Sequence, residues 1–83
     1  MIEDVTKYIV FDDGLDKHIL TFPAYVAHRD FADSLKELSD GMLYPISGGF
    51  VENGECVGES VSLRLKSRGE KDTSLLHKLL VIV

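Results

Sequence analysis

The sequence predicts an α+β fold: an antiparallel sheet of about four strands, built from two hairpins, with two short helices on one face. Two tight-turn signals, Asp13-Gly14 and Asn53-Gly54, each lie between runs of strand-forming residues. Two other segments carry apolar residues at helical spacing, which gives the order β-β-α-β-β-α. The 83 residues are expected to form a single domain, residues 1–83.

The first hairpin is expected from two β-rich runs, residues 7–11 and 17–22. Residues 12–16 form the turn between them, and Pro23 ends the return strand because it lacks a backbone N–H. The first run is apolar at consecutive positions, so it is expected to be largely buried.

The first helix is expected at residues 30–38, with His28 or Asp30 as its cap. Gly41 follows it and can adopt the left-handed conformation that ends helices. The residues of its apolar stripe lie at i, i+4 and i+7: Phe31, Leu35 and Leu38.

The second hairpin occupies residues 45–68, with Asn53 and Gly54 as its loop. This register pairs Glu52 with Glu55, Val51 with Cys56, Phe50 with Val57, Gly49 with Gly58, Ser47 with Ser60 and Ile46 with Val61. Two opposed glycines weaken a strand unless something approaches the backbone closely. Either an aromatic ring, from Phe50 or elsewhere, lies over Gly49 and Gly58, or a ligand or partner backbone does.

The second strand of this hairpin is expected to continue to residue 68. The extension needs a further partner strand, which the first hairpin could supply. Its alternation places the polar side chains on one face: Ser60, Ser62, Arg64, Lys66 and Arg68. They recur roughly every 7 Å, close to the spacing of nucleic-acid phosphates. The face is either a solvated surface paired with the acidic remainder of the domain or a site for a phosphate, nucleotide or acidic partner. If it is a site, Arg64→Glu with Arg68→Glu should abolish binding without unfolding the protein.

The second helix is expected to be capped by Asp72 or Thr73. Its apolar stripe comprises Leu75, Leu76, Leu79, Leu80 and Val83. The terminal residues 79–83 are all apolar and should be covered. A homodimer interface would comprise Leu79, Leu80, Ile82 and Val83. The alternative is docking within the chain, with residues 81–83 as an additional strand.

The net charge of −5 is unevenly distributed. Residues 1–60 carry four cationic side chains and twelve carboxylates, whereas residues 61–83 carry five and two. The overall negative charge disfavours general nucleic-acid binding, because the phosphate backbone repels it. The excess of cations in residues 61–83 still allows a local basic patch. A membrane span and a signal peptide are not expected. The lone Cys56 fits a reducing cytoplasm.

No catalytic or metal-binding constellation is expected. His18, His28 and His77 lack metal-ligand spacing, and each is expected to be structural. Cys56 lies mid-strand and is expected to be a small core residue. The glycines do not form a phosphate-binding loop, and no nucleophile has a base nearby in the sequence. The protein is therefore expected to be neither an enzyme nor a cofactor binder.

Several motifs occur together in one order along the chain. They are His28-Arg29-Asp30 with Ala32, then Ser47-Gly48-Gly49-Phe50-Val51, then Cys56-Val57-Gly58-Glu59-Ser60-Val61-Ser62-Leu63, then Lys66-Ser67-Arg68-Gly69-Glu70-Lys71-Asp72 with Leu75-Leu76. In this the chain resembles a group of small uncharacterised bacteriophage and prophage proteins over about residues 7–80. It departs from their pattern at Gly48, where alanine is common, and at Val57, where tyrosine is common, so a site built on that phenol is not carried over. The resemblance implies expression in a bacterial host cytoplasm and assigns no activity.

The sequence thus predicts a non-catalytic protein that acts by binding, as a homodimer, with a host or phage protein as a further partner. The candidate binding residues are Gly49, Phe50, Gly58, Ser62, Arg64, Lys66 and Arg68. One alternative is phosphate, nucleotide or nucleic-acid binding through the basic strand face. The other is a structural subunit of a larger assembly.

Overall fold

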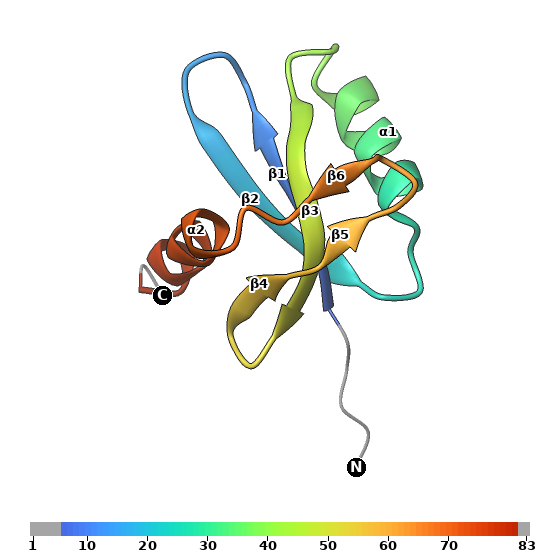
Figure 1. Cartoon of the computed structure of the whole chain (residues 1–83). Helices are drawn as coiled ribbons and strands as arrows, with labels where there is room; N and C mark the ends of the chain where they lie inside the picture. The colour runs from blue at the N-terminus through green and yellow to red at the C-terminus, as the bar shows by residue number, and fades with distance from the viewer. Residues whose placement is uncertain (1–5, 82–83) are drawn as a thin grey trace.

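The computed structural model describes residues 6–81 and confirms the α+β fold (Figure 1). The elements in chain order are β1 (Thr6–Asp12), β2 (Lys17–Pro23), α1 (His28–Leu38), β3 (Tyr44–Glu52), β4 (Glu55–Val57), β5 (Glu59–Ser60), β6 (Leu65–Lys66) and α2 (Glu70–Val81). Strands β1–β4 form one antiparallel sheet, and β5 pairs with β6 in a short separate ribbon. Neither described helix is long and apolar enough to cross a membrane.

Strand β1 is the centre of the sheet, whose strand order is β2-β1-β3-β4. Its four apolar residues, Tyr8 to Phe11, are fully buried, as the consecutive apolar run predicts. The partner of the first hairpin is β3, with Tyr8 opposite Gly49. The second strand of the later hairpin does not extend the sheet toward the first hairpin, because β4 ends at Val57 and lies on the far side of β3.

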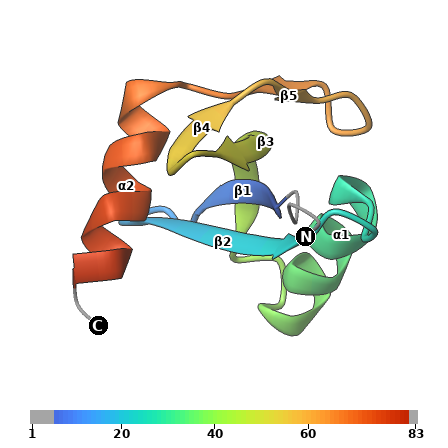
Figure 2. The same ribbon diagram turned by 90° about the horizontal axis from the view of Figure 1, so that it is seen from below.

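The two helices cover opposite faces of the sheet, so the expectation of helices on one face was wrong. Tyr8 and Val10 pack with Ile19, Cys56 and Leu76 of α2. Ile9 and Phe11 point the other way and pack with Phe22 and Ala32 of α1. Figure 2 shows α2 and α1 on either side of the sheet. The physical reason is that β1 is apolar on both faces, so both faces must be covered.

Helix α1 begins at His28, two residues before the predicted start. Its N-cap is Ala27, which makes no side-chain cap, so the expected caps His28 and Asp30 were wrong. Gly41 has φ 79° and donates its backbone N–H to the Lys36 carbonyl at 2.7 Å, which ends the helix as predicted.

The tip of the second hairpin has the predicted register, from Phe50↔Val57 to Glu52↔Glu55. Beyond it the chain leaves the sheet at Gly58, which has φ 77°. The predicted pairs Gly49–Gly58, Ser47–Ser60 and Ile46–Val61 therefore do not form. Of the two explanations for the glycines, the aromatic one is confirmed at Gly58, where a Cβ would lie 3.3 Å from Cδ1 of Phe50.

The long second strand was also a wrong expectation. Residues 61–64 form a turn, closed by the Arg64 N–H, which donates to the Val61 carbonyl at 3.2 Å. Arg64 has φ 58° there, a left-handed conformation that no continuous strand contains. The resulting β5–β6 ribbon crosses over β3 (Figure 1). Leu63, in its loop, packs against the apolar cluster beneath α1.

Helix α2 starts at Glu70, earlier than predicted, and Asp72 and Thr73 lie inside it rather than capping it. Leu76 is buried and Leu75 is partly buried against the sheet, while Leu79 is 46% exposed. The described chain is helical to Val81, which excludes a strand beginning at that residue. The predicted interface residues Ile82 and Val83, and the side chain of Leu80, lie outside what the structure describes.

Candidate binding surface

A buried polar network fixes α2 to the sheet and removes Arg68 from the predicted basic face. The Tyr8 hydroxyl donates to Asp72 Oδ2 at 2.6 Å, and both residues are fully buried. Arg68 donates its Nε to Asp72 Oδ1 at 2.7 Å and its backbone N–H to Oδ2 at 2.9 Å. Arg68 therefore neutralises a buried carboxylate, and it lines neither of the two grooves described below.

The network shifts the pKa values of its members. Burial by itself would raise the pKa of the Asp72 carboxyl, but the hydrogen bonds from Tyr8 and Arg68 outweigh burial and hold it below its usual range. Burial, followed by the bond to Asp72, raises the pKa of the Tyr8 phenol. Burial also raises the pKa of the Cys56 thiol, so Cys56 is a poor nucleophile, in keeping with a core residue.

Two adjoining grooves flank the β5–β6 ribbon, and together we call them the ribbon surface. The first, of about 270 Å³, is lined by Lys7, His28, Phe50, Glu59, Val61 and Ser62, with Ala27 at its side. The second, of about 330 Å³, is lined by Glu59, Ser60, Val61, Arg64, Leu65 and Lys66. Glu59 and Val61 belong to both grooves, and Val61 is 78% exposed. The structure thus brings together four predicted site residues, Phe50, Ser62, Arg64 and Lys66.

The ribbon surface is held in place by contacts at its back. Arg29 Nη1 donates to the Ser62 carbonyl at 3.4 Å, which joins the ribbon loop to α1. The Ser67 N–H donates to the Gly58 carbonyl at 2.9 Å, and the Ser67 hydroxyl donates to the Cys56 carbonyl at 3.1 Å. These bonds connect both ends of the ribbon to α1 and to β4.

The other two predicted site residues, Gly49 and Gly58, shape the surface from below and do not line it. Gly49 is buried, and its carbonyl accepts a hydrogen bond from Nε2 of His28 at 3.0 Å. The His28 ring meets the rings of Phe50 and Phe22 edge to face, with centroids 5.7 and 5.4 Å apart. Gly58 lies beneath Phe50. The glycines therefore position Phe50 and His28 at the floor of the first groove.

His28 is expected to make the fold sensitive to mild acid. Burial, the largest cause, lowers the pKa of its imidazole. The unfolded chain takes up a proton near about pH 6.5, while folded His28 resists protonation. The free energy of unfolding should therefore fall as the pH drops below about 6.5.

Urea unfolding of the wild type and His28→Asn between about pH 7 and pH 5 measures this effect. The wild-type curve should be the steeper one, because only the wild type carries the buried imidazole of His28. Parallel curves would contradict a role for His28.

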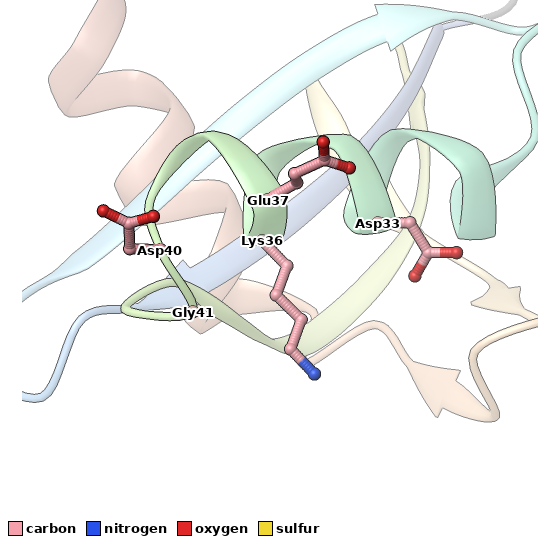
Figure 3. Close-up of a pocket in the computed structure, with 5 residues that line it drawn as sticks. All are labelled: Asp33, Lys36, Glu37, Asp40 and Gly41. Carbon is pink, nitrogen blue, oxygen red and sulfur yellow. The ribbon is translucent and has the colours of Figure 1, made fainter.

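A third concavity, of about 570 Å³, lies on the outer face of α1 and is lined by Asp33, Lys36, Glu37, Asp40 and Gly41. Figure 3 shows that the Asp33 and Asp40 carboxylates lie far apart along the helix and that the Lys36 amine points away from both. All five residues are exposed. Because its polar groups do not converge, this face is a solvated helix surface.

Sequence reasoning missed Lys7 and Val61 as parts of the candidate site. Val61 alternates with the polar residues of the predicted strand, which assigns it to the opposite, apolar face; only the turn at residues 61–64 exposes it. Lys7 reaches the groove because its Nζ donates to the Val26 carbonyl at 2.9 Å, across the β2–α1 connection. No local pattern indicates either arrangement. Among residues 6–81, no group of three His, Cys, Asp or Glu side chains could hold a metal ion.

Comparison with known proteins finds no matching protein family, curated protein or solved structure.

Proposed function

We propose that this chain is a non-catalytic binding protein whose ribbon surface holds a segment of another protein rich in acidic and apolar side chains. The observation that carries the proposal is the charge of this surface. Lys7, Arg64 and Lys66 line the two grooves and Arg29 supports their rim, against a single carboxylate, Glu59. A locally cationic surface on a chain of net charge −5 favours an acidic partner.

Apolar groups at the centre supply the second part of the recognition. Val61 is shared by both grooves and is largely exposed, and Phe50 lines the first. An apolar side chain of the partner can pack there while its carboxylates meet the flanking cations. Apolar anchors inside a polar rim provide most of the free energy in protein interfaces, whereas rim charges chiefly set partner choice and association rate.

The biological setting is also part of the proposal. The resemblance over residues 7–80 supports a phage- or prophage-type protein that works in the cytoplasm of a bacterial host, on a host or phage protein. The lone Cys56, which is buried and free, agrees with a reducing compartment. The exposed Leu79 supports self-association as a homodimer.

Phosphate, nucleotide or nucleic-acid binding remains the second candidate, because Arg64 and Lys66 share a groove with Ser60. The regular repeat of cations along a strand, which favoured nucleic acid, is absent, because residues 61–64 form a turn. A structural subunit is the third candidate, and a defined higher oligomer would distinguish it.

Charge reversal at the second groove should weaken binding of an acidic peptide at least tenfold, equivalent to about 1.4 kcal/mol. The probe is a fluorescent peptide of alternating Glu and Leu, and binding is measured by fluorescence anisotropy. The variant is Arg64→Glu with Lys66→Gln. The matched control, Lys71→Glu with Lys78→Gln, changes the net charge by the same amount at exposed positions of α2 and should bind the peptide like the wild type.

A peptide of alternating Lys and Leu and a single-stranded oligonucleotide serve as competing probes. Tight, salt-sensitive binding of the oligonucleotide would favour the nucleic-acid candidate instead. Equal loss of peptide binding in the variant and in the control would show that net charge, rather than the ribbon surface, governs binding. No binding of the acidic peptide by the wild type would contradict the proposal.

A further inference from the structure

Strand β2 forms an open edge of the sheet, because the strand order β2-β1-β3-β4 leaves it with β1 as its only neighbour among the described strands. Seven residues, Lys17–Pro23, pair with β1 without interruption. An unpaired edge of this length presents a row of backbone donors and acceptors to another strand.

The backbone groups that face outward can be assigned from the ladder. The Asp13 N–H donates to the Asp16 carbonyl at 3.1 Å, and in an antiparallel pair hydrogen-bonded positions alternate with non-bonded ones. With the observed register, His18, Leu20 and Phe22 bond to β1. The N–H and C=O groups of Ile19 and Thr21 therefore point away from β1. Pro23, which has no N–H, occupies an outward position of the same series, as edge prolines do.

Helix α2 adds an apolar group beside this edge. Figure 2 shows α2 crossing the strands from β4 to β2, with its last turn projecting past β2. Leu79 lies in this part of the helix and is 46% exposed. The helix packs on the sheet face that carries Ile19. The projecting turn is thus placed over any strand that pairs with β2.

We propose that a second copy of this chain pairs antiparallel along β2, so that the two sheets become continuous and each α2 covers part of the partner's strand. This inference rests on the self-association included in the proposed function, and it replaces an interface made by the C-terminal residues alone. It does not depend on the ribbon surface, which is formed by other elements.

The register of the pairing follows from the strand itself. A two-fold axis at Leu20 places Ile19 opposite the partner's Thr21, and the outward groups of these two residues form four hydrogen bonds across the pair of copies. Lys17 then faces the partner's Pro23, and His18 faces the partner's Phe22, so no like charges are opposed. Lys17 and Pro23 restrict pairing to the central residues, because such residues at strand ends block edge contacts.

One strand pair is a small contact compared with the roughly 1,200–2,000 Å² that stable interfaces bury. The projecting turn of α2 supplies the additional area. Helix α2 lies on the sheet face that carries Thr21. Leu79 would therefore pack on the face of the partner's sheet that carries the partner's Thr21. Both contributions are therefore required, and loss of either should dissociate the dimer.

Light scattering should give the full chain a mass twice that of the 9.2 kDa monomer. Thr21→Pro removes one outward N–H without breaking the β1–β2 ladder and should yield a monomer, as should Leu79→Asp. The matched control Met42→Asp alters another exposed apolar residue, 64% exposed in the α1–β3 loop, and should stay dimeric. Thermal unfolding should show that all three variants are folded.

Amide hydrogen exchange provides a readout that needs no variant. In the dimer the N–H groups of Ile19 and Thr21 should be protected, and their protection should increase with protein concentration. A dimeric Thr21→Pro, or rapid exchange at both amides in a wild-type dimer, would overturn the β2 interface while leaving self-association intact. A wild-type monomer would overturn both. Peptide binding at the ribbon surface is measured separately and is unaffected by either result.

Discussion

Asp72→Ala should lower the free energy of unfolding by about 3–5 kcal/mol, the usual cost of removing one partner from a buried charged pair. The carboxylate is fully buried and accepts three hydrogen bonds, one from Tyr8 and two from Arg68. Without it the Tyr8 hydroxyl is buried with no acceptor, and the partly buried Arg68 guanidinium loses its counter-charge. Because single domains are stable by only about 5–15 kcal/mol, this loss is a large share of the total.

Urea unfolding followed by circular dichroism measures this loss. Asp33→Ala, on the exposed face of α1 shown in Figure 3, is the control and should change stability by less than about 0.5 kcal/mol. Tyr8→Phe removes one hydrogen bond and should lower the free energy of unfolding by about 1–3 kcal/mol. This milder variant tests the same network if Asp72→Ala does not fold. Equal stability of Asp72→Ala and Asp33→Ala would show that the network does not hold α2 on the sheet.

Gly49→Ala is expected to cost about 3 kcal/mol, because a side chain at this position has no space. A Cβ on Gly49 would collide with the carbonyl oxygen of Val57, a backbone atom that cannot rotate away. To admit the methyl group, β4 must move away from β3 at the point where the chain turns at Gly58. The carbonyl of Gly49 also receives the His28 hydrogen bond, so the same movement disturbs the floor of the first groove.

The adjacent Gly48→Ala is the matched control. A Cβ there would lie 3.4 Å from Ser60 Cβ and from the Tyr8 carbonyl oxygen, which are ordinary contacts. This variant should change stability by less than about 1 kcal/mol. Urea unfolding of both variants measures the two changes in the free energy of unfolding. Similar losses in the two would contradict the close approach of Val57 to Gly49.

The parts of the fold that were predicted correctly depend on local chemistry. The turn within residues 12–16, the Asn53-Gly54 turn, the register of the second hairpin tip and the end of α1 at Gly41 each follow from residues close together in the sequence. The first turn is centred on Gly14-Leu15, one residue after the expected Asp13-Gly14, because the Asp13 N–H donates to the Asp16 carbonyl. The two-sided burial of β1 follows from its consecutive apolar residues, and the same observation could have indicated that helices are needed on both faces.

The parts that could not be predicted depend on contacts between distant segments. Residues 59–68 alternate like a strand, but the Val57 carbonyl occupies the space at Gly49 and Gly58 redirects the chain. Arg68 has the spacing of a surface cation, yet it serves a carboxylate that is itself bonded to Tyr8, 64 residues earlier in the chain. The candidate site was therefore predicted in its residues Phe50, Ser62, Arg64 and Lys66, but its shape was not.

The most direct measurement is a nuclear magnetic resonance titration of the ¹⁵N-labelled full chain with the alternating Glu–Leu peptide. We expect the largest amide shifts at Val61, Ser62, Arg64 and Lys66, with the amides of Asp33 and Lys71 unchanged. Such a map would place an acidic, apolar segment in the two grooves beside the β5–β6 ribbon. Shifts confined to α1 or α2, or no shifts at all when the peptide is in excess, would contradict the proposal that the ribbon surface is the binding site.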